Sequence, residues 1–224
     1  MGNFSLFGLR LALAMLASLF VGMTVREYAR ARATAALGDP TPRLWGRITL
    51  RPKPWFDPFG SAFVPALIAL LWAVGSPMIP AAYAKPAPID PTYLRRHPRD
   101  VVLASLAGPV ASLVLAIVGG LIVRVSGLEG EALVYAVTFV FTNASLFVFH
   151  LLPVPGLDGG RLVALLLPPQ AREVFRNADK YLPLIVLILL FVLFSILLGL
   201  VSTLTGAVCD AATGTDCLRS LVLF

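Results

Sequence analysis

The sequence is poor in charged residues, in cysteine and in histidine. Only 13% of its 224 residues are Asp, Glu, Lys or Arg, about half the fraction found in a typical soluble domain. The two cysteines, Cys209 and Cys217, form no CxxC pair, so a zinc or dithiol site built from cysteines is not supported. Histidine occurs only at His97 and His150. Apolar residues are abundant instead, at 58% of the chain, which indicates an integral membrane protein.

The basic residues lie where a membrane protein carries them. The net charge is +6, and the Lys and Arg residues flank apolar stretches rather than forming a basic patch interleaved with aromatic side chains. We therefore expect the lipid bilayer, and not nucleic acid, as the partner of this protein.

Five apolar stretches predict an all-α polytopic membrane protein with one transmembrane domain over residues 1–224. The expected elements are a helix over 7–37, a hairpin over 43–54, a re-entrant or spanning stretch over 59–84, a helix over 100–124, a helix over 131–152, an LDG loop and short helix over 153–168, a helix over 181–207, and an exocytoplasmic tail over 208–224. A signal peptide is the alternative for the first stretch, but its helical pattern continues to Gly38 without a cleavage site.

Two segments lack a clear helical pattern. In 43–54, Leu44, Ile48 and Leu50 alternate with polar residues, which suggests a short β-hairpin or an extended loop. The stretch over 59–84 is long enough to span a bilayer but is interrupted by one glycine and three prolines. It either crosses or is re-entrant, since broken helices are tolerated where they pack on protein.

The distribution of Lys and Arg favours the re-entrant alternative. Basic clusters lie in 30–53, 85–99 and 161–180, and they share one side of the membrane only if 59–84 does not cross. Because Lys and Arg accumulate in cytoplasmic loops, we expect four crossings with basic loops in the cytoplasm and both termini outside. Cys209 and Cys217 then lie outside, either as a disulfide or as free thiols.

Three segments carry motifs that occur together in one family. Residues 26–61 read REYARARATAALGDPTPRLWGRITLRPKPWFDPFGS, residues 84–113 include AKPAPIDP and AGPVAS, and residues 142–161 read TNASLFVFHLLPVPGLDGGR. In order and spacing they resemble the site-2 protease family of bacterial and other intramembrane zinc metalloproteases. Family members have HExxH followed by GDPT, then an AKPVPVNP loop with an AGPxAN helix, then NLLPxPxLDG. The resemblance covers about two-thirds of the chain.

The resemblance implies the position of a metal site. In HExxH, two histidines four residues apart share one helical face and bind zinc, while the glutamate polarises the bound water as general base. The aspartate of LDG is the third ligand. Carried over, the histidine positions are Arg26 and Arg30, the general-base position is Glu27, and the distant ligand is Asp158.

The resemblance also implies two substrate-binding positions. Asn143 keeps a family asparagine, and His150 stands where the family has an asparagine that holds the substrate backbone. A packed, hydrogen-bonded histidine is the plainer interpretation of His150.

The two arginines break the metal-site design. Arginine stays protonated and has no lone pair for a metal, so no metal cofactor is expected here, although zinc is expected in active relatives. Two guanidinium groups bring the same two positive charges as zinc held by two neutral histidines. We therefore predict a buried ion-pair cluster of Arg26, Arg30, Glu27 and Asp158. The alternatives are arginines that snorkel to the headgroups, an Asp158 that only caps a helix, and a residual metal site from Glu27, His150 and Asp158.

These features predict a catalytically inactive member, a pseudoprotease of the bacterial plasma membrane. Such a protein would bind or regulate single-pass transmembrane client proteins, and a strand near Arg47 to Leu50 could pair with an unwound client. An active intramembrane metalloprotease with an atypical metal site is the alternative. A transporter-like subunit is a second alternative, although no inverted repeat is visible.

Overall fold

The structure is a computed structural model that describes residues 5–75, 78–85, 89–96, 98–191 and 194–222. Its elements are α1 (Leu6–Ala36), α2 (Thr41–Leu44), a π-helical turn (Pro58–Phe63), α3 (Val64–Ala73), a 3-10 turn (Pro91–Tyr93), α4 (Arg99–Ser126), α5 (Gly130–Leu151), α6 (Asp158–Leu166), α7 (Pro169–Asn177), a second 3-10 turn (Ala178–Tyr181), α8 (Leu182–Phe191), α9 (Phe194–Thr213) and α10 (Cys217–Val222). No strand occurs in these ranges, so the predicted all-α class is confirmed.

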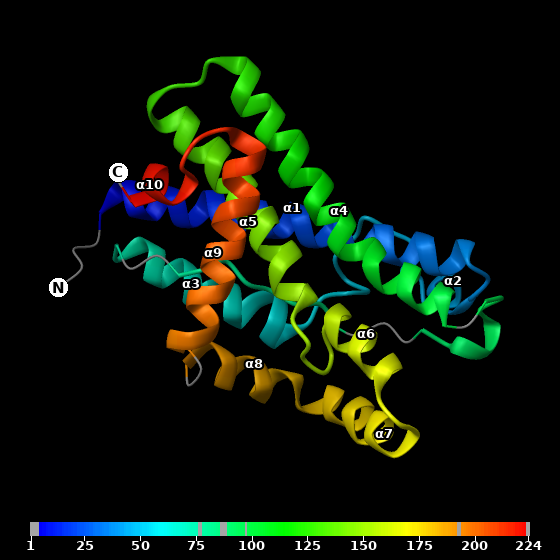
Figure 1. Ribbon diagram of the computed structural model, residues 1–224. Coiled ribbons are helices and arrows are strands. Elements are labelled where there is room, and N and C mark those ends of the chain that lie inside the picture. Colours follow the sequence, from blue (N-terminus) through cyan, green and yellow to red (C-terminus); the bar gives the residue numbers. More distant parts are fainter. Residues whose placement is uncertain (1–4, 76–77, 86–88, 97, 192–193, 223–224) are drawn as a thin grey trace.

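Three helices, α1, α4 and α5, are long and apolar enough to cross a bilayer. They pack against one another, and α9 lies across α4 and α5 (Figure 1). α5 is the central helix, because 67% of its apolar 18-residue segment is buried inside the protein. The corresponding share is 44% for α1 and 39% for α4. The exposed apolar side chains of α1 and α4 would be unfavourable in water and are suited to lipid. The protein is therefore an integral membrane protein.

Small residues let these helices approach closely. A Cβ atom added at Gly22 of α1 would lie 2.6 Å from Asn143 Oδ1 of α5, and one added at Gly120 of α4 would lie 2.5 Å from the Ala212 carbonyl carbon of α9. In lipid, burying an apolar side chain between helices gives no hydrophobic stabilisation, because the lipid tails are equally apolar. Close van der Waals contacts of this kind stabilise helix association instead.

The stretch over 59–84 doubles back on itself. The π-helical turn and α3 run away from Gly60, and the chain then returns in an extended conformation along 78–84. The Tyr83 N–H donates to the Gly60 carbonyl at 3.1 Å, and the Ser61 hydroxyl donates to the Tyr83 carbonyl at 2.9 Å. At the far end, the Trp72 indole N–H donates to the Met78 carbonyl at 2.7 Å. Both ends of the stretch therefore lie side by side, as a re-entrant segment would require.

The β-hairpin expected over 43–54 is wrong. Arg43 and Leu44 end helix α2, and the part of the chain from 45 to 57 is irregular. The Arg47 N–H donates to the Pro42 carbonyl and the Thr49 N–H to the Arg47 carbonyl, so the donors of a strand are used in tight turns. The apolar alternation implies buried leucines on one face of a strand. Instead, Leu44 and Leu50 are 79% and 61% exposed, and Arg47 is buried. The expected β-pairing of a client at Arg47 to Leu50 loses its basis as well.

The apolar stretch over 181–207 is expected to form one helix, but it is divided between two helices, α8 and α9. α8 and α9 run in different directions, and α9 continues to Thr213, beyond the expected start of the tail (Figure 1). An uncharged run specifies burial but not direction. The direction of α9 follows its packing on α4 and α5.

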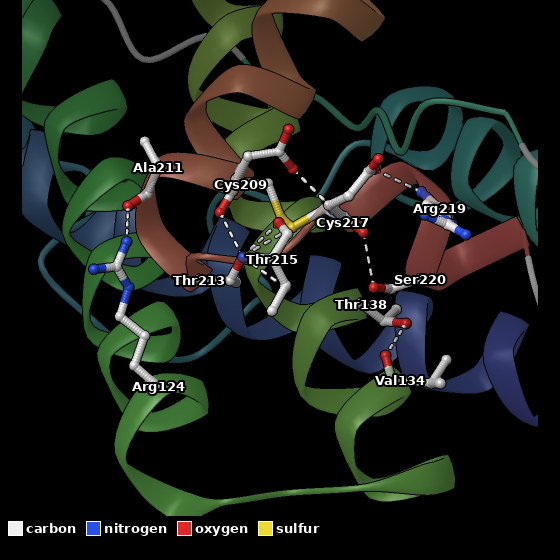
Figure 2. Close-up of a disulfide and its surroundings, with 12 residues drawn as sticks. Arg124, Val134, Thr138, Cys209, Ala211, Thr213, Thr215, Cys217, Arg219 and Ser220 are labelled. Atoms are coloured by element: carbon white, nitrogen blue, oxygen red, sulfur yellow. Dashed lines mark hydrogen bonds between the residues drawn. A yellow bond between two sulfur atoms is a disulfide. The ribbon is translucent and has the colours of Figure 1, made fainter.

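A disulfide joins Cys209 of α9 to Cys217 of α10, which decides between the two alternatives left open by the sequence (Figure 2). The intervening turn is held by the Asp210 carboxylate, which accepts from the Cys217 N–H at 2.8 Å. The Arg124 guanidinium at the end of α4 donates to the Ala211 carbonyl at 2.5 Å (Figure 2). The disulfide thus lies at the same end of the helices as the start of α5 and the N-terminus of α1, where Arg10 pairs with Glu131 at 3.3 Å.

Candidate functional site

Helix α1 places three charged side chains in the interior of the protein. Arg26 and Arg30 are four residues apart and so share one face of the helix, and Glu27 lies beside them. Asp158, the first residue of α6, approaches from the other side. All four side chains are buried, and Arg26 and Asp158 are each only 1% exposed.

The four side chains form a closed ring of ion pairs, hereafter the ion-pair cluster. Arg26 donates through Nη1 to Glu27 Oε1 at 2.5 Å and through Nη2 to Asp158 Oδ2. Arg30 donates through Nη2 to Glu27 Oε2, and its Nη1 lies 3.3 Å from Asp158 Oδ1. Each guanidinium therefore bridges both carboxylates, and each carboxylate uses both of its oxygens.

The charges of the ion-pair cluster balance. Two buried guanidinium groups face two buried carboxylates, and Arg161, at the edge of the cluster, adds a contact of 3.5 Å to Asp158. A buried charge costs several kcal/mol unless it is paired and hydrogen-bonded, and the ring gives each of the four groups two oppositely charged partners. Removing any one member leaves a buried charge without compensation.

Glycines bring the two sides of the cluster together. A Cβ atom added at Gly159 would overlap the Leu151 carbonyl, and one added at Gly160 would overlap the Val154 carbonyl. The turn after α5 can therefore fold tightly under the end of that helix and point Asp158 inward. On α4, a Cβ atom added at Gly108 would lie 3.3 Å from Arg26 Cγ, so this glycine makes room for the arginine side chain.

Two plainer interpretations of the charged residues are wrong. Arg26 and Arg30 do not snorkel to the headgroups, since both are buried and ion-paired. Asp158 does not cap α6, because the capping position is Leu157 and the Asp158 carboxylate faces the arginines.

The predicted substrate-binding residues are buried on α5. The Asn143 amide donates to the Phe139 carbonyl at 2.9 Å, and its Oδ1 has no partner in the described part of the chain. His150 Nδ1 lies 2.9 Å from the Leu146 carbonyl. A carbonyl can only accept, so Nδ1 carries the proton. Nε2, which has no partner in the described ranges, presents a lone pair. Neither residue belongs to the ion-pair cluster, and both side chains are buried.

The side chains at this site do not fit a zinc ion. Zinc in a catalytic site needs three donors with lone pairs and one open position, whereas two of the equivalent side chains are cations. The oxygens of Glu27 and Asp158 are occupied by guanidinium groups. Across the described ranges, no group of three or more His, Cys, Asp or Glu side chains is placed to hold a metal ion.

A small pocket beside the ion-pair cluster was not predicted from the sequence. It has room for about one water molecule and is lined by Glu27, Arg30, Ala31, Thr34, Pro42, Arg47, Trp55 and Ile89. Arg47 donates to the Lys85 carbonyl at 3.0 Å, and the indole N–H of the buried Trp55 has no partner among the described residues. The apolar alternation predicts Arg47 in a strand, whereas in the tertiary fold Arg47 lines the same pocket as Glu27, from the loop after α2.

Comparison with known proteins connects this geometry to a family. The chain is 31% identical over 201 residues to a Bacillus subtilis (strain 168) protein named "Putative zinc metalloprotease YwhC", and the match covers 86% of each chain. The chain belongs to the site-2 protease family. Proteins named Rip2 with the same description, from Mycolicibacterium smegmatis and Mycobacterium tuberculosis, are each 29% identical over 79% and 80% of this chain and 66% of their own length. No family model and no solved structure matches the chain.

Membership of the site-2 protease family gives the ion-pair cluster its context. The relatives are named zinc metalloproteases, so zinc is the cofactor of active members. In this member, arginine occupies both positions where the family motif has histidine, while the glutamate and the distant aspartate are kept. By the motif resemblance, the cluster corresponds to the metal position of active members.

Proposed function

We propose that this protein is a non-proteolytic member of the site-2 protease family that binds the transmembrane segments of client proteins. The observation that carries the proposal is the ring of Arg26, Glu27, Arg30 and Asp158. It fills the family's metal position with charges that balance one another and that offer a metal no open coordination site.

The metal content of the purified protein tests the loss of chemistry. We expect roughly a tenth of an equivalent of zinc or less after purification in detergent with added zinc, because guanidinium groups repel the ion. The measurement is elemental analysis together with cleavage assays on transmembrane peptides. One tightly bound equivalent of zinc, with cleavage lost in Glu27→Gln, would establish the active protease instead.

Binding of a client is tested by crosslinking inside the membrane. A photo-crosslinking amino acid at Ile89, on the wall of the pocket beside the cluster, is expected to capture a single-pass protein. The matched control is the same amino acid at Val125, which is 83% exposed near the far end of α4. Capture of the same proteins from both positions would mean contact by chance, and no capture from Ile89 would remove the support for a client.

The membrane orientation forms part of the proposal. Arg10, Arg124 and Arg219 lie in segments at the disulfide end, whereas the other Lys and Arg residues outside the cluster lie in segments at the opposite end. The positive-inside rule places the basic end in the cytoplasm, and a disulfide is stable in the oxidising compartment on the other side. Two unrelated physical rules thus support one orientation, with α1 entering the membrane from outside.

The redox state of the cysteines in intact cells tests this orientation. After acid quenching, a maleimide of high mass is expected to add nothing to the protein without reductant and two labels after reduction. The variant Cys217→Ser is the control and should accept one label under both conditions. Free thiols in the unreduced native protein would place the Cys209 end in the cytoplasm.

A further inference from the structure

A pocket at the basic end of the helices, away from the ion-pair cluster, is surrounded by arginines. It has a volume of about 210 Å³ and lies where the C-terminus of α1 meets the N-terminus of α4. Its lining residues are Ala36, Leu37, Arg95, Arg96, Arg99, Asp100 and Leu103. We propose that this pocket binds the phosphate of an anionic phospholipid of the cytoplasmic leaflet, with an acyl chain lying along α4.

The positive charge of the pocket is only partly compensated by the protein. Arg95, Arg96 and Arg99 form no ion pair with any carboxylate in the described ranges. The one acidic residue of the lining, Asp100, is buried, and its Oδ2 accepts from the Arg96 backbone N–H at 2.9 Å. Three cationic side chains therefore surround the pocket, and the carboxylate that could neutralise one of them is turned to the backbone.

The backbone holds the pocket in shape. Gly38, with φ of +117°, follows α1, and a Cβ atom there would lie 2.9 Å from the Tyr93 carbonyl and 3.5 Å from Arg95 Cγ. Asp39 joins the same two loops, because its Oδ2 accepts from the Asp90 N–H at 2.9 Å. Arg95 is thus positioned over the end of α1 by a close loop contact.

The apolar side of the pocket continues into the membrane. Leu103, which lines the pocket, is 43% exposed and begins a stripe along one face of α4. The stripe comprises Leu103, Val110, Val114, Ile117, Val118, Leu121, Ile122 and Val125, all of which are exposed. A ligand that joins a phosphate to a hydrocarbon chain matches this sequence of surfaces, whereas a free phosphate uses only the arginines. Basic pockets at the cytoplasmic ends of helices are suited to anionic headgroups.

Lipid binding to three variants tests the proposal. Native mass spectrometry of the protein in detergent, titrated with dioleoyl-phosphatidylglycerol, is expected to show one lipid bound more tightly than dioleoyl-phosphatidylcholine. Replacing the arginines in R95Q/R96Q/R99Q should weaken this binding roughly fivefold for each charge lost, on the order of a hundredfold together. The matched control R43Q/R51Q/K53Q removes three exposed charges from another loop of the basic end and should retain the lipid.

The source of the phosphate is decided by the remaining measurements. Leu103→Asn should weaken phosphatidylglycerol binding while leaving competition by inorganic phosphate unchanged, because only the acyl chain contacts Leu103. Equal affinity in the native protein and R95Q/R96Q/R99Q, or an equal loss in the control variant, overturns the proposal. Full displacement of the lipid by inorganic phosphate, with no effect of Leu103→Asn, also overturns it and assigns the pocket to a free anion. The side chains changed are exposed, and the result does not depend on whether the ion-pair cluster is catalytic.

Discussion

The double substitution Arg26→His/Arg30→His is expected to create a zinc site, with about one equivalent of zinc bound where the native protein binds roughly none. The histidines would be four residues apart on one face of α1, and loss of the arginines frees the Asp158 carboxylate for the metal. Two imidazoles and one carboxylate make the three-ligand set of a catalytic zinc site, and Glu27 remains beside it. Elemental analysis and zinc-dependent thermal stabilisation measure the effect.

Three controls accompany this variant. Adding Asp158→Asn removes the third ligand and should abolish most of the bound zinc. The pair Arg26→Gln/Arg30→Gln removes the same charges without supplying donors and should bind none. Each single histidine variant retains one cation in the site and should also fail. If the folded double variant binds no zinc, then α1 and α6 have moved too far from the family's geometry for two substitutions to restore the site.

The substitution Asp158→Asn is expected to lower the free energy of unfolding by about 3–5 kcal/mol. It leaves Arg26 and Arg30 with Glu27 as their only carboxylate, and a buried positive charge is then uncompensated. Equilibrium unfolding in mixed micelles, followed by helical circular dichroism, measures the change. If the variant fails to accumulate, the yield of trypsin-resistant protein in membranes gives the same comparison.

An exposed ion pair provides the matched control. Arg10 and Glu131 lie 3.3 Å apart with side chains about half exposed, so Glu131→Gln should cost at most about 1 kcal/mol. Adding Arg26→Met to Asp158→Asn restores the balance of charge between Glu27 and Arg30, and we expect it to recover more than half of the lost stability. A similar small effect for Asp158→Asn and Glu131→Gln would mean that the buried ring contributes little.

The motifs predicted the site better than the hydrophobic pattern predicted the backbone. The spacing of Arg26, Glu27 and Arg30 places them on adjoining faces of one helix, and the family resemblance names Asp158 as their partner. Burial at 43–54 was misjudged because an alternating apolar pattern is also produced by an irregular loop whose buried residue is Arg47. Periodicity reports which residues are apolar, but not whether a backbone donor is already used in a turn.

The path of 59–84 was likewise indicated only in part by the sequence. Prolines in the sequence indicate a broken segment, but the bonds that return the chain to Gly60 join residues more than 20 positions apart. Likewise, the apolar run over 181–207 gives no direction, and the angle between α8 and α9 comes from packing on α4 and α5. The arginine pocket could not be predicted from the sequence either, because its lining residues come from two distant segments, the end of α1 and the start of α4.

The sequence alone indicated that this is a membrane protein and that it is helical, because both follow from its composition. The motif resemblance predicted that two arginines stand at the family's histidine positions. The tertiary structure decided that the four charged groups close into a ring, that one apolar stretch turns back, and that Cys209 meets Cys217. The ring and the folded-back stretch depend on contacts between residues more than 20 positions apart, and the disulfide depends on the turn between α9 and α10. No local pattern encodes these contacts.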